Sequence, residues 1–318
     1  MTTLDTAPAP PRAGPAPVLD GQRPPGEMFL VGLFVALPTL ALFAAVPLAW
    51  GWGLGWLDVA LAVAFYAVSC LGVTVGFHRY FTHGAFKAKR PLRIALAIAG
   101  SLSLQGSVLD WVGDHRRHHA FSDKEGDPHS PWLHGTGPAA LITGFWHAHL
   151  GWLFNRDLTN MKRFAPDLLA DRDIQRVDRA FPLIVVVSLL GPALIGGLVT
   201  MSWWGALTAL FWAGFVRVAV LHHVTWSINS ICHIWGERPF ASRDKSANVW
   251  WLAVLSCGES WHNLHHADPT CARHGVKKGQ IDISAVVIRG FEKLGWAFDV
   301  RWPTTRRLER LSATKARS

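Results

Sequence analysis

Nine of the 16 histidines in this chain of 318 residues fall into four short groups. In HRRHH, which begins at residue 115, and in HNLHH, which begins at residue 262, three histidines occupy positions i, i+3 and i+4. Positions with this spacing share one face of an α-helix, so their imidazoles can converge. Converging imidazoles are common ligands of Fe, Zn, Cu and Ni. The nine are His78, His83, His115, His118, His119, His233, His262, His265 and His266.

The number of clustered imidazoles indicates more than one metal ion. They cannot all be protonated close together, because neighbouring positive charges lower one another's pKa. Neutral imidazoles that share divalent cations avoid this repulsion, and nine ligands exceed what one ion accepts, so we expect two ions. Asn229 shares a helix face with His233. Asp114 and Glu259 lie beside histidine groups and are candidates to accept hydrogen bonds from ligand imidazoles.

The spacing of the first histidine pair requires a break in its helix. His78 and His83 would diverge by about 140° on one α-helix, because successive residues are about 100° apart. We therefore expect the helix to end near Tyr80, ahead of Gly84, and His83 to turn back toward the site.

The other seven histidines are expected to have structural roles. Three in apparent loops are expected to be solvated, and four in partly apolar stretches are expected to be hydrogen-bonded. The former are His129, His134 and His274, and the latter are His147, His149, His222 and His223.

Four apolar runs must position these groups. Each has the length of about 20 residues that a membrane-spanning helix needs. The alternative, four buried helices of this length in a soluble protein, is disfavoured by their number. The runs cover residues 28–50, 54–77, 180–200 and 203–224.

The distribution of Lys and Arg predicts the orientation of these spans. Neither residue occurs from Met28 to Phe77 or from Ala180 to Val216, although the net charge is +9. Basic residues favour the cytoplasmic side of a membrane. We therefore expect two hairpins in the cell membrane, with both termini and all four histidine groups in the cytoplasm. The basic residues form no recognisable nucleic-acid-binding motif, so we expect no nucleic acid partner.

The expected domain is bounded by polar segments at both ends. Residues 1–27 are rich in Pro and Ala without apolar periodicity, which predicts a disordered segment. The membrane domain is expected to cover 28–300, and 301–318 to form a basic tail. The stretch IDISAVVIRGFEKLGW, from residue 281, predicts an amphipathic helix that lies on the membrane or caps the domain.

The histidine groups and their flanks resemble those of a known family. HRYFTH, HRRHHAFSDKEGDPH, GFWHAHLGW, NSICHIWGERPF and GESWHNLHH occur in this order between about Leu61 and Gly275. This ordered set resembles the membrane fatty acyl desaturases of the stearoyl-CoA (Δ9) type. The resemblance implies an all-α integral membrane fold, with four transmembrane helices under a cytosolic helical cap that holds a non-heme di-iron centre.

The resemblance also implies the chemistry. By position, the nine grouped histidines match the family's iron ligands, and Asn229 matches a residue that reaches one iron through water. Two Fe ions would activate O₂ and insert a cis double bond, expected at Δ9, into a long-chain acyl group. Two electrons would come from the acyl chain and two from outside.

Three positions depart from the animal acyl-CoA enzymes. Those enzymes have Arg, Asn and an Arg-Lys pair, in that order, where this chain has Gly113, Gly106 and Arg156-Asp157. These positions serve the CoA headgroup in that family, so the acyl donor could be a CoA or acyl-carrier-protein thioester or a phospholipid. Arg156 and Trp226 still match as substrate contacts, and Tyr66 matches a tyrosine that closes the end of the acyl tunnel.

The electron donor is expected to be a separate protein. The chain has no heme-domain signature, no Gly-rich dinucleotide fingerprint and no clustered cysteines for an iron–sulfur centre. A ferredoxin with an NAD(P)H reductase would satisfy this need, and the basic cytosolic face favours an acidic partner.

Two alternatives remain from the sequence. A membrane di-iron hydroxylase or fatty acid decarboxylase would use the same histidine groups. A non-catalytic metal transporter would need polar residues in its spans, and Asp58, near one end, is the one charged candidate from Met28 to Phe77.

Overall fold

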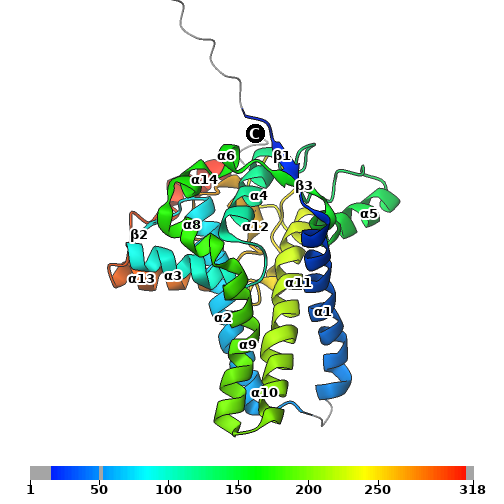
Figure 1. Ribbon diagram of the computed structural model, residues 1–318. Coiled ribbons are helices and arrows are strands. Elements are labelled where there is room, and N and C mark those ends of the chain that lie inside the picture. Colours follow the sequence, from blue (N-terminus) through cyan, green and yellow to red (C-terminus); the bar gives the residue numbers. More distant parts are fainter. Residues whose placement is uncertain (1–15, 50–52, 313–318) are drawn as a thin grey trace, which may run out of the picture.

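The computed structural model describes residues 16–49 and 53–312, and it is mostly helical. Long helices run side by side at one end of the molecule, and shorter helices gather at the other end, here called the cap (Figure 1). Four helices are long and apolar enough to cross a membrane, so the chain is a membrane protein. They cover Pro25–Ala49, Trp56–Thr82, Phe181–Thr200 and Trp203–His233.

Four helices able to span a membrane occur where the apolar runs predicted them, but two of them are longer than expected. The second consists of α2 (Trp56–Leu71) followed by the π-helix η1 (Gly72–Thr82). The fourth consists of α10 (Trp203–Ala209), the π-helix η3 (Leu210–Val216), α11 (Arg217–Ser230) and a 3₁₀ turn, η4 (Ile231–His233). Both helices continue past their apolar runs into the cap, and these extensions carry histidines of the candidate site.

The cap is formed by shorter helices and two small antiparallel sheets. The sheets pair β1 (Leu19–Gln22) with β3 (Asp157–Thr159), and β2 (Lys87–Ala88) with β4 (Ala297–Phe298). The α-helices are α3 (Arg90–Ser101), α4 (Val108–Phe121), α5 (Pro138–His149), α6 (Met161–Phe164), α7 (Pro166–Ala170), α8 (Arg172–Arg179), α12 (His262–Ala267), α13 (Ile283–Lys293) and α14 (Thr305–Leu311). Two 3₁₀ helices, η2 (Gly151–Phe154) and η5 (Trp250–Leu252), complete it.

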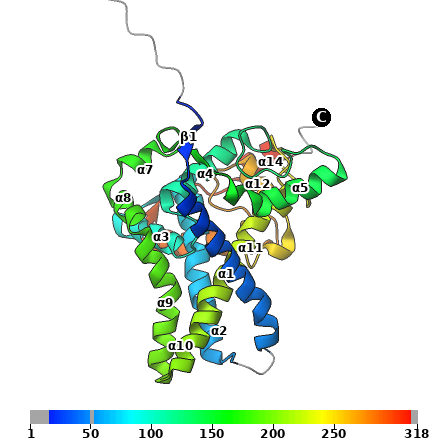
Figure 2. The same cartoon turned by 45° about the vertical axis from the view of Figure 1, so that its right-hand side comes forward.

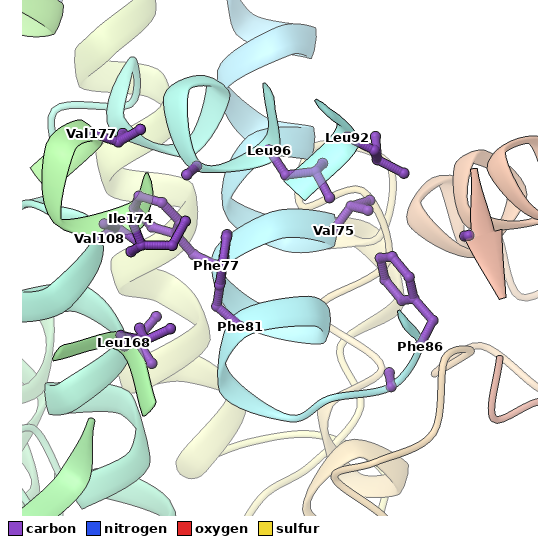
Figure 3. Packing of buried hydrophobic residues seen from close by; sticks show 14 of the residues in the cluster. Val75, Phe77, Phe81, Phe86, Leu92, Leu96, Val108, Leu168, Ile174 and Val177 are labelled. Carbon is purple, nitrogen blue, oxygen red and sulfur yellow. The ribbon is translucent and has the colours of Figure 1, made fainter. Parts of the chain in front are cut away.

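Glycines let the cap pack closely on the second span. A Cβ atom on Gly72 would lie 2.1 Å from the carbonyl carbon of Ala99, so η1 and α3 touch through their backbones. Phe77 fills the space above Gly100 and belongs to a buried apolar cluster that joins η1 to α3, α4 and α8 (Figure 3). This packing fixes the part of η1 that carries His78.

Both stretches expected at the chain ends contain regular structure within the described residues. The expected disordered segment, 1–27, lies partly outside the described residues, but Leu19–Gln22 forms β1 and α1 (Pro25–Ala49) begins before Glu27. The expected tail, 301–318, contains the helix α14, and Ala241 N–H donates to the Leu311 carbonyl at 2.9 Å. Pairing with distant segments orders the described parts of both stretches, and composition alone does not report such pairing.

The packing of the spans bears on the expected hairpins. α9 (Phe181–Thr200) packs closely on α10 after a two-residue connection, whereas α1 packs against η3 and α11. The two-hairpin arrangement and the cytoplasmic orientation stay predictions. The expected amphipathic helix is α13, which packs on η1 and leaves Val286 exposed.

Candidate metal centre and its cavity

The nine grouped histidines lie together as two clusters in the cap. In each cluster, one ring nitrogen of every member lies within 4.8 Å of those of the others. The first cluster is His78, His83, His115, His119 and His265, and the second is His118, His233, His262 and His266.

Two short helices supply histidines to both clusters. On α4, His115 and His119 are one helical turn apart and belong to the first cluster, while His118 belongs to the second. The arrangement on α12 is reversed, because His262 and His266 belong to the second cluster and His265 to the first. The i, i+3, i+4 spacing therefore serves two adjacent centres rather than one.

The helix that carries His78 differs from our expectation. It ends at Thr82, close to Tyr80 and ahead of Gly84 as expected, but its last part is a π-helix, in which hydrogen bonds join residues five apart. His83 N–H donates to the His78 carbonyl at 3.2 Å, and the two imidazole centroids are 4.8 Å apart. The wider helix brings positions i and i+5 onto one side, so no reversal of the chain is needed.

Four histidines have a carboxylate beside Nδ1. Such a carboxylate fixes the imidazole tautomer and leaves Nε2 free to bind a metal. The pairs are His78–Glu259 at 2.5 Å, His118–Asp127 at 2.9 Å, His233–Asp123 at 3.1 Å and His266–Asp244 at 2.5 Å.

One of the two expected carboxylates takes part in these pairs. Glu259 contacts His78, as expected, whereas Asp114 accepts a hydrogen bond from the Thr159 hydroxyl at 2.5 Å. Sequence analysis missed three carboxylates. Asp123 and Asp127 lie in SDKEGD directly after the second histidine group, which could have indicated them. Asp244 is 22 residues before His266, and nothing in that spacing indicates contact.

Two histidines expected to be solvated are buried beside the clusters. His129 is 3% exposed and stacks on His118, with ring centroids 4.3 Å apart. His274 is 1% exposed and lies 3.4 Å from Glu259. Both expectations are wrong because the loops that carry them fold inward. His134 is exposed, as expected.

The remaining histidines are mostly hydrogen-bonded, as expected. His149 Nδ1 lies 3.0 Å from the Ser230 hydroxyl, and its Nε2 lies 3.1 Å from His223 Nδ1. His222 Nε2 lies 2.9 Å from the Ser103 carbonyl. For His147, the described residues offer no hydrogen-bond partner to Nε2.

Burial favours the neutral form of several clustered imidazoles. It lowers the pKa of His83, His115 and His119 well below the usual value, and neighbouring imidazoles lower it further. The pKa of His266 falls to about 4, because burial outweighs the opposing effect of Asp244. A neutral imidazole has the free lone pair that metal binding requires.

The donor set fits metal ions. Nε2 of His265 lies 3.0 Å from Nε2 of His78 and 2.9 Å from Nε2 of His119. In the second cluster, Nε2 of His262 lies 3.1 Å from that of His233 and 3.0 Å from that of His266. Neutral rings that point the same nitrogens at one another gain little unless a cation lies between them.

A large apolar cavity reaches both clusters. Its volume is about 680 Å³, within the range typical of small-molecule sites. His78, His115 and His262 line it, as do Trp226 and Asn229 from α11. Asn229 is half-buried on the cavity side of α11, one helical turn before His233.

Hydrogen bonds brace the cavity wall beside the clusters. The Gln105 amide donates to the Thr225 hydroxyl at 2.9 Å, and the Trp111 indole donates to Gln105 at 3.3 Å. These contacts join the loop after α3 to α11 and α4.

The other expected substrate contacts lie at the two ends of the cavity. The Tyr66 hydroxyl donates to the Leu255 carbonyl at 2.7 Å, and its ring packs on the cluster that contains Cys70, which lines the cavity. Arg156 is exposed and donates to the carbonyl of Arg23, which lines the opposite end. Neither Tyr66 nor Arg156 lines the cavity itself.

Gly113, which stands where the animal acyl-CoA enzymes have an arginine, is tightly packed. A Cβ atom on Gly113 would lie 2.3 Å from the Met161 sulfur, so a longer side chain would require Met161 to move.

Fold and site together define a membrane protein whose all-histidine candidate metal site faces a long apolar cavity. The chain belongs to the fatty acid desaturase family, whose sequence model matches residues 54–280. It is therefore a fatty acyl desaturase, and the resemblance to Δ9-type enzymes is confirmed.

Several relatives align with most of the chain. It is 42% identical over 279 residues to the hex-5-enoyl-[acyl-carrier protein] acetylenase of Moorena producens (strain JHB), covering 87% of each chain. It is 38% identical over 260 residues to the Delta-9 acyl-lipid desaturase 1 of Arabidopsis thaliana, covering 82% of this chain and 80% of the relative. It is 34% identical over 277 residues to the sn-1 stearoyl-lipid 9-desaturase of Anabaena variabilis, covering 86% and 92%.

Proposed function

We propose that this chain is an O₂-dependent desaturase that inserts a cis double bond at Δ9 of a long-chain acyl group, with two iron ions at the histidine clusters. The observation that carries the proposal is the arrangement of nine imidazoles as two clusters beside one apolar cavity. The active site and both termini would lie on the cytoplasmic side of the cell membrane. The Lys and Arg residues gather at the two chain ends and in the segment between the second and third spans, and basic segments remain cytoplasmic.

The clusters suggest how the ligands divide between the ions. One iron would be held by His78, His83, His115, His119 and His265. The other would be held by His118, His233, His262 and His266, with Asn229 acting through a water molecule. Bound iron would supply the activation of O₂ needed to remove hydrogen from two unactivated methylene groups.

The protein's own residues would bind and position the acyl chain. A methylene chain offers no polar handle, so the shape of the cavity must decide which carbons lie beside the clusters. Trp226 would contact the chain there, and the Gln105–Thr225–Trp111 contacts would keep the wall in place. Glu259, Asp123, Asp127 and Asp244 would hold the ligand imidazoles in the required tautomer.

The electron balance requires a partner. Removing two hydrogens supplies two electrons, and reducing O₂ to water takes four, so two must come from a separate donor. A ferredoxin with an NAD(P)H reductase would fit the basic cap, because electrostatic complementarity favours an acidic partner.

The position of the double bond and the acyl carrier follow from different observations. The names of two relatives specify the 9 position, which supports Δ9. The carrier could be CoA, an acyl carrier protein or a phospholipid, and Gly113 and Asp157 argue against the CoA contacts of the animal enzymes.

A metal transporter is the least supported alternative. Asp58 accepts a hydrogen bond from Gly55 N–H at 2.9 Å, so its carboxylate caps the start of α2. A capping role explains this buried charge without a transport pathway.

Product analysis tests the proposal. The protein should be expressed in a host without Δ9 unsaturated lipids and purified for metal analysis. We expect about two irons per chain, by the ligand count, and monounsaturated acyl chains with the double bond at C9. Hydroxy acids or terminal alkenes would indicate the hydroxylase or decarboxylase, and stoichiometric zinc in active protein would contradict the di-iron centre.

A further inference from the structure

The first and third spans form the two sides of the cavity. Leu30, Val31, Phe34 and Val35 of α1 line it, as do Pro182, Val185 and Val186 of α9. α1 packs on η3 and α11, whereas α9 packs on α10, η3 and α2. The two helices run apart from each other toward the far end of the bundle (Figure 2).

Apolar residues at the outer edge of this groove are partly exposed. Leu30 and Val186 line the cavity and are each 49% exposed, so the same apolar side chains contact both the cavity and the outside. On α1 the lining residues end at Val35, about 15 Å along the helix from Pro25 at 1.5 Å per residue. In a membrane, the groove would therefore open toward the hydrocarbon layer next to the cap.

The water-facing end of the cavity is covered by chain. Arg23, Trp152 and Leu153 line this end. Arg23 N–H donates to the Arg156 carbonyl at 2.8 Å, directly after β1 pairs with β3. The cavity is thus walled toward the cap and bordered by exposed apolar side chains toward the lipid.

The charges at the covered end do not suit a polyanion. Besides Arg23, the lining there includes the carboxylates of Glu27, Asp110 and Asp114. A nucleotide headgroup with several phosphates would need cationic groups in excess. A headgroup of low charge that stays at the bilayer surface fits this mixture better.

We propose that the groove between α1 and α9 is a lateral portal, through which an acyl chain of a bilayer glycerolipid reaches the histidine clusters. The proposal rests on the proposed desaturase function, and it adds the form in which the acyl group arrives. The chain would slide between Leu30 and Val186 while the headgroup remains in the plane of the membrane. Beyond the portal, the cavity leads to His78, His115 and His262 without passing through water.

Paired tryptophan variants test the portal. Leu30→Trp with Val186→Trp places bulk in the groove at two partly exposed positions. The matched control is Leu33→Trp with Val187→Trp, on the same helices at positions that are exposed but do not line the cavity. Each protein is reconstituted with a saturated phosphatidylcholine and an electron donor, and its iron content is measured.

We expect the groove variant to convert the bilayer lipid at least about tenfold more slowly, because the acyl chain can no longer be positioned. The control should stay within about twofold of the wild type, and iron content should be the same in all three. Equal rates in the groove variant and the control would overturn the portal.

A second measurement needs no turnover. A phosphatidylcholine with a photoreactive diazirine in one acyl chain is crosslinked to the metal-free protein, and the modified peptides are mapped. Crosslinks to the cavity-lining residues of α11 between Val224 and Asn229 are expected in the wild type and the control and should be lost in the groove variant. Crosslinks confined to the outer surface of the spans would contradict the portal.

The two proposals fail in different ways. A wild-type protein that holds iron but desaturates neither bilayer lipid nor acyl thioester would overturn the desaturase function. A wild-type protein that desaturates an acyl-carrier-protein thioester but not bilayer lipid would overturn the portal alone.

Discussion

Tautomer control is the central feature of the site at the level of single residues. Wherever a carboxylate contacts Nδ1 of a clustered histidine, the nitrogen left to face the cluster is Nε2. The short contacts within the clusters join Nε2 atoms, including those of His78, His119 and His265. Acid and imidazole therefore act as a unit, and loss of either should weaken the site.

The sorting of histidines into ligands and others can be tested directly. His265→Ala should abolish desaturation and lower the iron content, because His265 lies in the first cluster and is fully buried. His134→Ala should keep most of the activity, because His134 is exposed. Product analysis and metal analysis on both folded variants check this, and equal loss in the two would show that the sorting is wrong.

The carboxylates that sequence analysis missed give a second test at this scale. Asp244→Asn keeps the size of the side chain but removes the charge beside His266, so iron affinity should fall by about tenfold or more. Asp299→Asn is the control, because Asp299 pairs with Lys87 at an exposed position outside the histidine clusters. Iron titration measures the difference, and unchanged affinity in Asp244→Asn would remove Asp244 from the site.

At the level of elements, the π-helix η1 marks where an analysis based on α-helical spacing fails. The i, i+3, i+4 groups on α4 and α12 could be predicted, because those helices have regular geometry. His78 and His83 could not, because their approach depends on hydrogen bonds between residues five apart. Likewise, the inward folding of the loops at His129 and His274 depends on tertiary contacts that no local pattern reports.

Backbone contact between η1 and α3 makes one glycine critical. Gly72→Ala should destabilise the protein, because the added Cβ would meet the Ala99 backbone, and overpacking of this kind costs about 1–3 kcal/mol. Gly290→Ala on α13 is the control, since a Cβ atom added there would have no neighbouring atom within 4 Å, and alanine favours a helix over glycine.

Thermal unfolding of the detergent-solubilised variants measures the effect. The midpoint should fall by several degrees for Gly72→Ala, at about 2–4 °C per kcal/mol, and should stay level or rise for Gly290→Ala. If both variants unfolded at the wild-type temperature, η1 and α3 would not be in backbone contact.

At the scale of the whole molecule, the distribution of charge and the position of the site lead to the same orientation. Both histidine clusters lie at the cap end, where the long loops and both described chain ends also lie (Figure 1). The Lys and Arg residues gather in these same segments, and the connectors at the other end have none. Sequence patterning could therefore predict the four apolar helices and that the histidine groups lie at one end of them, although not how the helices pack; the cytoplasmic orientation stays a prediction.

Topology mapping tests this orientation. Tags fused at each terminus should be protected from an impermeant reagent in intact cells and accessible after lysis, because basic segments remain cytoplasmic. A tag placed in the 201–202 connector should show the opposite behaviour. External labelling of either terminal tag in intact cells would contradict the orientation.

The length of the cavity is also a property of the whole bundle, and Tyr66 is expected to limit it. Tyr66 lies one helical turn beyond Cys70, which lines the cavity, and its hydroxyl ties α2 to the Leu255 carbonyl. Twelve residues separate it from His78, and because residues 72–78 are π-helical, the rise between the two is shorter than the about 18 Å of a regular α-helix. A phenol ring at this depth would stop the methyl end of the acyl chain.

Tyr66→Ala should therefore shift the preference toward longer acyl chains while leaving the iron content unchanged. Tyr66→Phe separates the two roles of the side chain, because it keeps the ring and loses the hydrogen bond to Leu255. We expect Tyr66→Phe to keep the wild-type chain-length profile, measured by competition among saturated chains of different length. If Tyr66→Ala folds, binds iron and also keeps that profile, the limit lies nearer the clusters, at Cys70 and Ser256.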